Sequence, residues 1–400
     1  MKVLLSAYAC EPAKGSEPGA GWNWALAAAR RHEVWVMTRA NNRPAIEEAL
    51  ARNPRSSLHF EYIDLPSWAR WWKRGPRGAR LYYVLWQVLA ATRARRLQRE
   101  RGLEVVHHLT FANVWLPALA WVADAPFVLG PVGGGQRVPI RLYPVLGVSG
   151  AVREVLLLLA RSLARFSPPV RFGWRRAAVI LVNNEETRAA LPRRHRSKTV
   201  VRPNASVPDE LRPGNAPSRG VRSAVYAGRL NRFKGVSLAI EALRYAPRWS
   251  LTIIGEGPDA GRLARIARRT DVADRVRFVP WLAQKELWRE LASSHALLLP
   301  SLKEGASFII VEAQALGVPV VALGATGVSV LAQTPGAPFE RIRAGNRRQC
   351  VRDIAAALER LEVGSLATET SDHSLERVAE DIDLVYCVAA GRRAASGGAL

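Results

Sequence analysis

The sequence predicts an α/β protein made of two Rossmann-like domains, each with a doubly wound parallel sheet, that face each other across a cleft. Three observations support this fold class. Short apolar segments rich in Val, Ile and Leu have the composition of strands buried on both faces. Longer segments with helical spacing separate them. The alternation occurs twice, on either side of a stretch rich in Pro, Gly, Ser and Asn at 203–222.

Each half of the chain contains its own series of expected strands. The first series is Lys2–Ala7, Glu33–Thr38, Glu104–His107, Phe127–Gly130 and Val179–Asn183. The second is Ala224–Ala227, Ser250–Gly255, Arg275–Val279, Ala296–Pro300 and Val318–Leu323. Helices are expected between them, among others at Gly21–Arg30, Gly235–Ala246 and Lys285–Ser293.

The stretch rich in Pro, Gly, Ser and Asn at 203–222 sets the expected domain limits. Residues 1–202 form an acceptor domain and 203–375 a donor domain, and 376–400 hold a helix that crosses back to the first domain and a disordered tail. In open parallel sheets ligands bind beyond the carboxyl ends of the strands, so the site is expected in the cleft.

The charge of the chain is unusual for a globular protein. Fifty-eight Lys and Arg against 34 Asp and Glu give a net charge of +24. This excess suggests a polyanionic partner: nucleic acid, an anionic membrane or a phosphorylated small molecule. Cys10, Cys350 and Cys387 lie far apart, which argues against disulfides or a zinc site and fits a reducing, cytoplasmic compartment. No stretch is expected to reach the roughly 18–20 apolar residues that a membrane-spanning helix needs.

One basic segment stands apart from the strand and helix pattern. Trp68–Arg101 contains ten Lys or Arg, a single Glu and four Trp. Basic flanks with Trp and Tyr suit an anionic membrane surface. A helix packed against the first domain, with its Arg residues solvated, explains the same segment equally well.

The chemistry of the second half is concentrated after two expected strands. Glu304, Gly305 and Glu312 lie in the segment Leu299–Ala315, where a helix is expected from Phe308. The N–H groups of Ala306, Ser307 and Phe308 would form an anion site at the start of this helix, and the carboxylates suit sugar hydroxyls. Taken alone, Glu304 could instead cap the helix and Glu312 could be a solvated surface acid.

A second loop makes a site at this position more credible. In Val225–Gly235, a strand ends at Gly228 and is followed closely by Arg229 and Lys234. Cations at the carboxyl end of a parallel strand are placed to neutralise a diphosphate.

With these motifs the sequence resembles the family 4 retaining glycosyltransferases, which have the GT-B architecture. The resemblance rests on AGRLNRFKG, the turn Ile253–Pro258 and the two glutamates eight residues apart. It implies that Arg229 and Lys234 bind the donor diphosphate, Glu304 the donor sugar and Glu312 the ribose. It also assigns donor binding to the backbone of Gly228, Gly255, Gly305, Ala306, Ser307 and Phe308. Many members have Phe and Gly where this chain has Ala306 and Ser307.

The first half offers further candidates. Gly19 and Gly21 follow the first strand, without the third glycine of a dinucleotide fingerprint, and the resemblance places them near the donor. His107 and His108 end a strand, and the resemblance gives one of them a catalytic role at the reacting centre. Gly133, Gly134 and Gly135 are expected on the acceptor side. For all of these, a purely structural role is the alternative.

The resemblance implies transfer of a sugar from a nucleotide diphosphate sugar to a glycan or lipid-linked acceptor in cell-surface polysaccharide synthesis, with retention and without a metal or other cofactor. Asp381 and Asp383 match a metal-binding pattern, but residues two apart on a helix do not face one another. The expected location is cytoplasmic, at the inner face of the plasma membrane if the basic segment binds lipid. A non-catalytic protein that binds nucleotide sugars or nucleic acid is the alternative, although no nucleic-acid-binding signature occurs.

Overall fold

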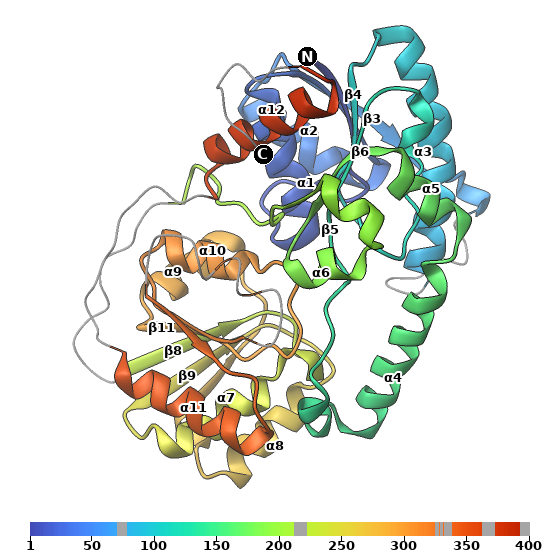
Figure 1. The fold of residues 1–400 in the computed structure, drawn as a ribbon. Coiled ribbons are helices and arrows are strands. Elements are labelled where there is room, and N and C mark those ends of the chain that lie inside the picture. The colour runs from blue at the N-terminus through green and yellow to red at the C-terminus, as the bar shows by residue number, and fades with distance from the viewer. Residues whose placement is uncertain are drawn as a thin grey trace. The chain divides into compact units, whose positions relative to one another are not determined.

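The computed structural model describes residues 1–69, 78–211, 222–324, 328, 331, 338–361 and 373–392. The chain forms two compact units (Figure 1). The first comprises Met1–Gly135, Ala160–Ser206 and Ser374–Leu400, and the second comprises Gln136–Leu159 and Val207–His373. The sequence-based limits differ from these units mainly at Gln136–Leu159, which groups with the second unit although it lies in the first half of the chain.

The first unit contains a parallel sheet of seven strands in the order β3-β2-β1-β4-β5-β6-β7. The direction of strand addition reverses between β1 and β4, as in a doubly wound sheet. The strands are β1 (Lys2–Ser6), β2 (Glu33–Arg39), β3 (Leu58–Ile63), β4 (Val105–His108), β5 (Phe127–Val132), β6 (Ala177–Val182) and β7 (Thr199–Val201).

The second unit contains a parallel sheet of six strands in the order β10-β9-β8-β11-β12-β13, which reverses between β8 and β11. Its strands are β8 (Arg222–Ala227), β9 (Trp249–Ile254), β10 (Val276–Val279), β11 (Ala296–Leu299), β12 (Val320–Leu323) and β13 (Phe339–Ile342). The two sheets confirm the predicted fold class.

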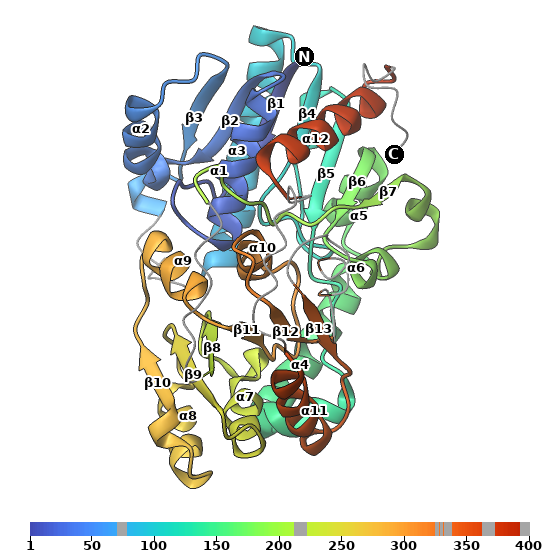
Figure 2. The same ribbon diagram turned by 90° about the vertical axis from the view of Figure 1, so that its left-hand side faces the viewer.

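Helices cover both faces of each sheet (Figures 1 and 2). In the first unit they are α1 (Ser16–Ala29), α2 (Arg43–Arg52), α3 (Ala79–Arg101), α5 (Pro168–Arg176), α6 (Glu185–Ala190) and α12 (Leu375–Ala389). In the second they are α7 (Val236–Ala242), α8 (Ala260–Arg269), α9 (Gln284–Ala292), α10 (Phe308–Ala315) and α11 (Arg347–Arg360). Helix α4 (Tyr143–Ala164) begins in the second unit and ends in the first.

Alternation along the strands divides the core of the first unit into two layers. Leu4 faces the layer that contains residues of α3, whereas Val3 and Leu5 face the layer that contains α1 and α12. Helix α12 therefore belongs to the first unit, as the expected crossing back of the C-terminal helix requires.

The structure resolves the role of most of the basic segment Trp68–Arg101. Residues 70–77 lie outside the described residues. Helix α3 buries Tyr83, Trp86 and Leu97 completely in the core of the first unit. The described part of this segment therefore packs against the first unit, which is one of the two explanations that the sequence offered.

Helix α4 was not anticipated from the sequence. Among the described residues, Ile140–Ala164 is one helical segment that is long and apolar enough to cross a membrane by length and composition. The expectation that no such segment exists was wrong. Arg141, Arg153 and Glu154 interrupt the apolar residues, so no continuous apolar stretch reveals this helix.

The strands that sequence analysis missed lie at or near sheet edges. β3 and β13 are edge strands and β7 has three residues. β3 has the sequence LHFEYI and only its first residue is buried. A continuous apolar segment marks a strand buried on both faces, and an edge strand lacks that signal.

His107 and His108 are core residues of the first unit, and both side chains are completely buried. The ring of His107 contacts the Tyr386 hydroxyl at 2.8 Å and the Gly130 carbonyl oxygen at 2.6 Å. The ring of His108 contacts the Tyr83 hydroxyl at 3.0 Å and lies 3.3 Å from Ser6 Oγ. Burial lowers the pKa of His107 to about 4 and that of His108 to about 3.

Replacement of Gly255 tests how closely the backbones of the second unit approach each other. Gly255 has φ +132°, and a Cβ there would lie 2.2 Å from the Gly228 carbonyl oxygen. We expect Gly255→Ala to lower the free energy of unfolding by about 1–3 kcal/mol. Gly261→Ala in α8 is the matched control, because no atom lies within 4 Å of its Cβ position. Urea denaturation measures both, and equal stabilities would contradict the close approach.

Acid titration tests the burial of the histidines. Because the pKa of His107 is lowered on folding, the unfolded chain binds more protons between pH 6.5 and 4, and stability falls as the pH decreases through this range. We expect a loss of about 2 kcal/mol from this group between pH 7 and pH 5. His107→Gln should therefore lose about that much less than the wild type in urea denaturation at the two pH values. His59→Gln, at a half-buried side chain, is the control. An unchanged loss in His107→Gln would contradict the lowered pKa of His107.

Candidate functional site

The predicted donor-site residues lie at the carboxyl edge of the second sheet. Strands β9, β8 and β11 are neighbours, and the order of the sheet reverses between β8 and β11. The loops after these strands carry Gly255, Arg229 with Lys234, and Glu304. The carboxyl ends at such a reversal are the usual ligand site of an open parallel sheet.

Close backbone contacts fix the loops after β8 and β11 against one another. Gly235 has φ +61°, and a Cβ there would lie 2.2 Å from the Pro300 carbonyl oxygen. The Leu302 N–H donates to the Phe233 carbonyl oxygen at 2.8 Å. A side chain at position 235 would push the loops apart, so the glycine is required here.

Lys234 and Glu304 form an ion pair between these two loops. Lys234 Nζ lies 2.7 and 3.1 Å from the two carboxylate oxygens of Glu304. Glu304 is 9% exposed. It does not cap α10, whose N-cap residue is Ser307. The structure thus brings together the cation and the carboxylate that the sequence assigned to one site.

Glu312 is a buried carboxylate of α10, and a solvated surface position is excluded. It is 3% exposed, and Gln284 Nε2 of α9 donates to its Oε1 at 3.1 Å. Burial raises the pKa of Glu312, while polar groups of Trp288 and Gln284 favour its charged form. A buried carboxylate whose orientation is fixed by an amide donor is suited to accept hydrogen bonds from hydroxyl groups.

The remaining predicted residues of this unit lie on the same two loops as the ion pair or directly after them. The side chain of Arg229 is exposed, and its carbonyl oxygen accepts a hydrogen bond from the Tyr226 hydroxyl at 3.1 Å. Helix α10 begins at Phe308, as predicted, after extended backbone at Ser307. At Gly305 a Cβ would meet only Gln136 Nε2, at 3.7 Å, so protein packing alone does not require glycine there.

Sequence analysis missed the support for these loops from Gln136–Leu159. Glu154 of α4 is completely buried and pairs with Lys303 Nζ at 2.7 Å, next to Glu304. Arg232 Nη1 donates to the Leu146 carbonyl oxygen at 3.2 Å. The available signal was charge: Glu154 is the single acidic residue among eight Arg between positions 137 and 176.

Two further polar groups near the site have no hydrogen-bond partner within the described part of the chain. These are Ser301 Oγ, on a residue that is 1% exposed, and Asn231 Oδ1. They lie on the same two loops as Glu304 and Lys234. Buried polar atoms normally have partners, so they are candidates for ligand contacts.

The glycines predicted in the first unit have packing roles. A Cβ at Gly19 would lie 1.9 Å from the Lys14 carbonyl oxygen, and one at Gly21 would lie 2.1 Å from that of Ala9. Gly134 has φ +90° and packs on Asn113, while Gly135 packs on the backbone of Thr187. Gly133 pairs with Asn113 in an isolated bridge. Donor and acceptor roles for these glycines stay predictions.

The histidines predicted as catalytic do not face an open site in this structure. Both are interior groups of the first unit, held by Tyr386 and Gly130 in one case and by Tyr83 in the other. Alternation along β4 was expected to turn one ring toward the site, but both faces of this strand are buried. The catalytic role of His107 or His108 stays a prediction.

The aspartates that match a metal-binding pattern, Asp381 and Asp383, contact other side chains of the first unit. Asp381 pairs with Arg202 at 3.0 Å, and Asp383 lies 3.4 Å from His32. They lie on α12 and point to different partners, in keeping with their spacing on a helix.

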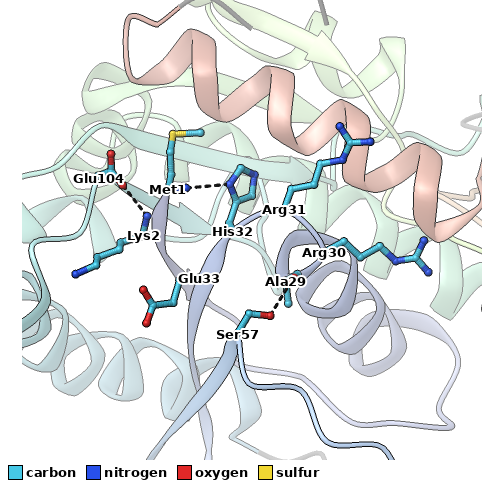
Figure 3. A pocket seen from close by; sticks show the side chains of 9 residues that line it. All are labelled: Met1, Lys2, Ala29, Arg30, Arg31, His32, Glu33, Ser57 and Glu104. Atoms are coloured by element: carbon cyan, nitrogen blue, oxygen red, sulfur yellow. Dashed lines mark hydrogen bonds between the residues drawn. The ribbon is translucent and has the colours of Figure 1, made fainter. Parts of the chain in front are cut away.

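A hollow at the amino edge of the first sheet is lined by Met1, Lys2 and residues that start β2 (Figure 3). Its cations already have partners: Arg30 and Arg31 pair with Glu376, and Lys2 Nζ donates to the Arg101 carbonyl oxygen at 3.3 Å. We do not assign it a ligand.

Residues 209–334 match the family model of glycosyl transferases group 1. The D-inositol 3-phosphate glycosyltransferase of Streptomyces griseus is 32% identical over 142 residues, which cover 29% of this chain and 30% of that protein. Glycogen synthase of Mycobacterium tuberculosis is 39% identical over 105 residues, 25% of either chain. The chain thus spans less than a third of the length of these curated relatives.

Solved structures match over nearly the full chain. The Anabaena protein HepE in complex with UDP and glucose has a TM-score of 0.56 and 17% identity, with 97% of both chains covered. Sucrose-phosphate synthase from Thermosynechococcus elongatus has a TM-score of 0.60 and 15% identity, with 96% of this chain and 98% of that one covered. These likenesses establish the fold. The chain has the two-domain GT-B fold, and residues 209–334, most of its second unit, match the family model of glycosyl transferases group 1.

Proposed function

We propose that the chain is a retaining glycosyltransferase that moves a sugar from a nucleotide diphosphate sugar to an acceptor hydroxyl. The observation that carries this proposal is the Lys234–Glu304 pair at the reversal point of the second sheet. It lies inside the segment that matches the group 1 family. A solved structure of the same fold contains UDP and glucose, which supports a nucleotide sugar as the donor.

Lys234 and Arg229 supply the positive charge that the leaving diphosphate needs in this reaction. Negative charge builds on the leaving diphosphate as the bond to the sugar breaks, and preorganised cations and N–H donors stabilise it. Lys234 is held in place by the loop after β11, and the exposed Arg229 stands at the end of β8. The N–H groups of Ala306, Ser307 and Phe308 at the start of α10 add a positive partial charge.

The two glutamates would bind hydroxyl groups. Glu304 accepts from the donor sugar, and Lys234 Nζ holds its carboxylate in place at 2.7 Å. Glu312 accepts from the ribose, with Gln284 fixing one of its oxygens. In this proposal the cations bind the phosphate groups, and the carboxylates bind the hydroxyl groups of the sugar and the ribose.

We further propose transfer with retention, on one face of the sugar, without a metal ion, since Lys234 and Arg229 supply the positive charge. The acceptor is a growing glycan or a lipid-linked saccharide in cell-surface polysaccharide synthesis. The proposed location is the cytoplasmic side of the membrane. A basic protein that binds nucleotide sugars or nucleic acid without catalysis remains the competing hypothesis, and turnover distinguishes the two.

Removal of either member of the ion pair tests the proposed donor site. We expect Lys234→Ala and Glu304→Ala each to lower kcat by about 100-fold or more. Lys234→Ala removes a cation that stabilises the leaving diphosphate, and Glu304→Ala removes the acceptor that positions the donor sugar. The assay offers a panel of nucleotide sugars and follows donor cleavage, with proton NMR of the anomeric product to establish retention.

Arg277→Ala and Glu290→Ala are the matched controls. These residues form an exposed ion pair of 2.8 Å in the same unit, and exposed pairs contribute at most about 1 kcal/mol. Their turnover should remain near that of the wild type. Wild-type turnover in both site variants would eliminate this site, and absence of cleavage of every nucleotide sugar would favour the non-catalytic alternative.

A further inference from the structure

Helix α4 exposes a continuous apolar stripe. Val152, Val155, Leu156, Leu159 and Leu163 are between 45% and 72% exposed. With 3.6 residues per turn these positions occupy a stripe about 100° wide on one side of the helix. Phe166, just beyond the helix, continues it and is 60% exposed. Such a stripe is the surface an amphipathic helix normally buries.

The opposite side of α4 is attached to protein. Glu154 lies on this opposite side, is completely buried and pairs with Lys303. The Glu154 carboxylate also accepts from the Val138 N–H at 3.4 Å. A helix held in this way by a buried ion pair cannot be surrounded by lipid, although its length and composition would allow it to span a bilayer. It is built to lie on a surface with its apolar side outward.

The exposed charges of the segment that carries the stripe have one sign. Residues 137–176 contain eight Arg and one acidic residue, and that residue is the buried Glu154. The exposed charge of this segment is therefore entirely positive. A second copy of the chain on the same face would bring these arginines against one another, whereas an anionic surface would neutralise them.

A basic hollow of about 440 Å³ in the first unit adds a second observation. Its lining includes Arg95, Arg99 and Arg176, with Asp124 as the acidic member. Trp121 forms one wall, lies under Arg176 at 5.6 Å and stacks on Phe172 of α5 at 6.1 Å. Phe172 is 46% exposed and follows Phe166 closely in the sequence. Aromatic rings beside cations are characteristic of the membrane–water interface.

We propose that the α4 stripe docks on the surface of a lipid bilayer with anionic headgroups, and that the hollow of the first unit, considered by itself, receives a headgroup phosphate. The apolar side chains enter the boundary between headgroups and acyl chains. Arg99 and Arg176 meet the phosphate. The proposed lipid-binding surface is distinct from the face of α3 that is buried in the core. The proposal that it binds lipid does not depend on the proposed transferase activity.

Flotation of the full-length protein with lipid vesicles tests the proposal. We expect the wild type to float with vesicles of phosphatidylcholine and phosphatidylglycerol, and to float poorly with phosphatidylcholine alone or at high salt. The double variant Leu159→Glu/Leu163→Glu should reduce the bound fraction about ten-fold, because charge on the stripe opposes insertion. Arg99→Glu/Arg176→Glu should reduce binding to the anionic vesicles.

Matched controls separate the surface from general effects. Trp281→Glu places the same charge at an exposed apolar residue of the second unit, and Arg268→Glu/Arg269→Glu makes the same charge reversal on α8. Both controls should bind vesicles nearly as the wild type does. Melting temperatures close to the wild-type value establish that each variant is folded.

Three results would overturn the proposal. The first is absence of wild-type flotation with anionic vesicles at low salt. The second is equal flotation of the stripe variant and the Trp281→Glu control. The third is concentration-dependent self-association in sedimentation that the stripe variant abolishes without any lipid binding, since the stripe would then be an interface between copies of the chain.

Discussion

The ion pair of Lys234 and Glu304 is the interaction on which the site depends. A carboxylate that is nine-tenths buried needs a cation beside it, and Lys234 Nζ supplies one at 2.7 Å. The two residues come from loops after different strands, so the pair exists only because the sheet order places β8 next to β11. Gly235 then lets the first loop approach the Pro300 carbonyl oxygen. The ion pair therefore requires the strand order of the sheet, the backbone conformation at Gly235 and the two opposite charges.

Helix α4 links this site to the surface of the protein. Its inner side holds Lys303, the neighbour of Glu304, through the buried Glu154, and the Leu146 carbonyl oxygen near its start accepts a hydrogen bond from Arg232. Its outer side carries the exposed apolar stripe. One segment therefore supports both loops of the proposed donor site and presents the face that we propose to meet lipid. An enzyme that acts on a lipid-linked acceptor would gain from such proximity, since the acceptor is confined to the same surface.

The sequence predicted those parts of the molecule whose signals are local. Buried parallel strands appear as short apolar segments, and Lys234, Glu304 and the start of α10 follow from the residues next to two of them. The roles of His107 and Glu154 depend on residues distant in the chain: Tyr386 at the far end of the sequence, and Lys303. No local pattern records these contacts. β3 was missed because exposure removes the continuous apolar stretch that marks a buried strand. Helix α4 was missed because charged residues such as Arg153 and Glu154 interrupt its apolar residues.

Calorimetric titration of nucleoside diphosphates, without the sugar, tests the central claim most directly. UDP, GDP and ADP should be titrated into the wild type, Lys234→Met and Arg277→Met. If Lys234 neutralises the donor diphosphate, one of these nucleotides binds the wild type and Arg277→Met alike, and binds Lys234→Met about ten-fold or more weakly, as expected for loss of a charge-assisted contact of about 1.5–3 kcal/mol. Equal affinity for Lys234→Met and the wild type would contradict the claim.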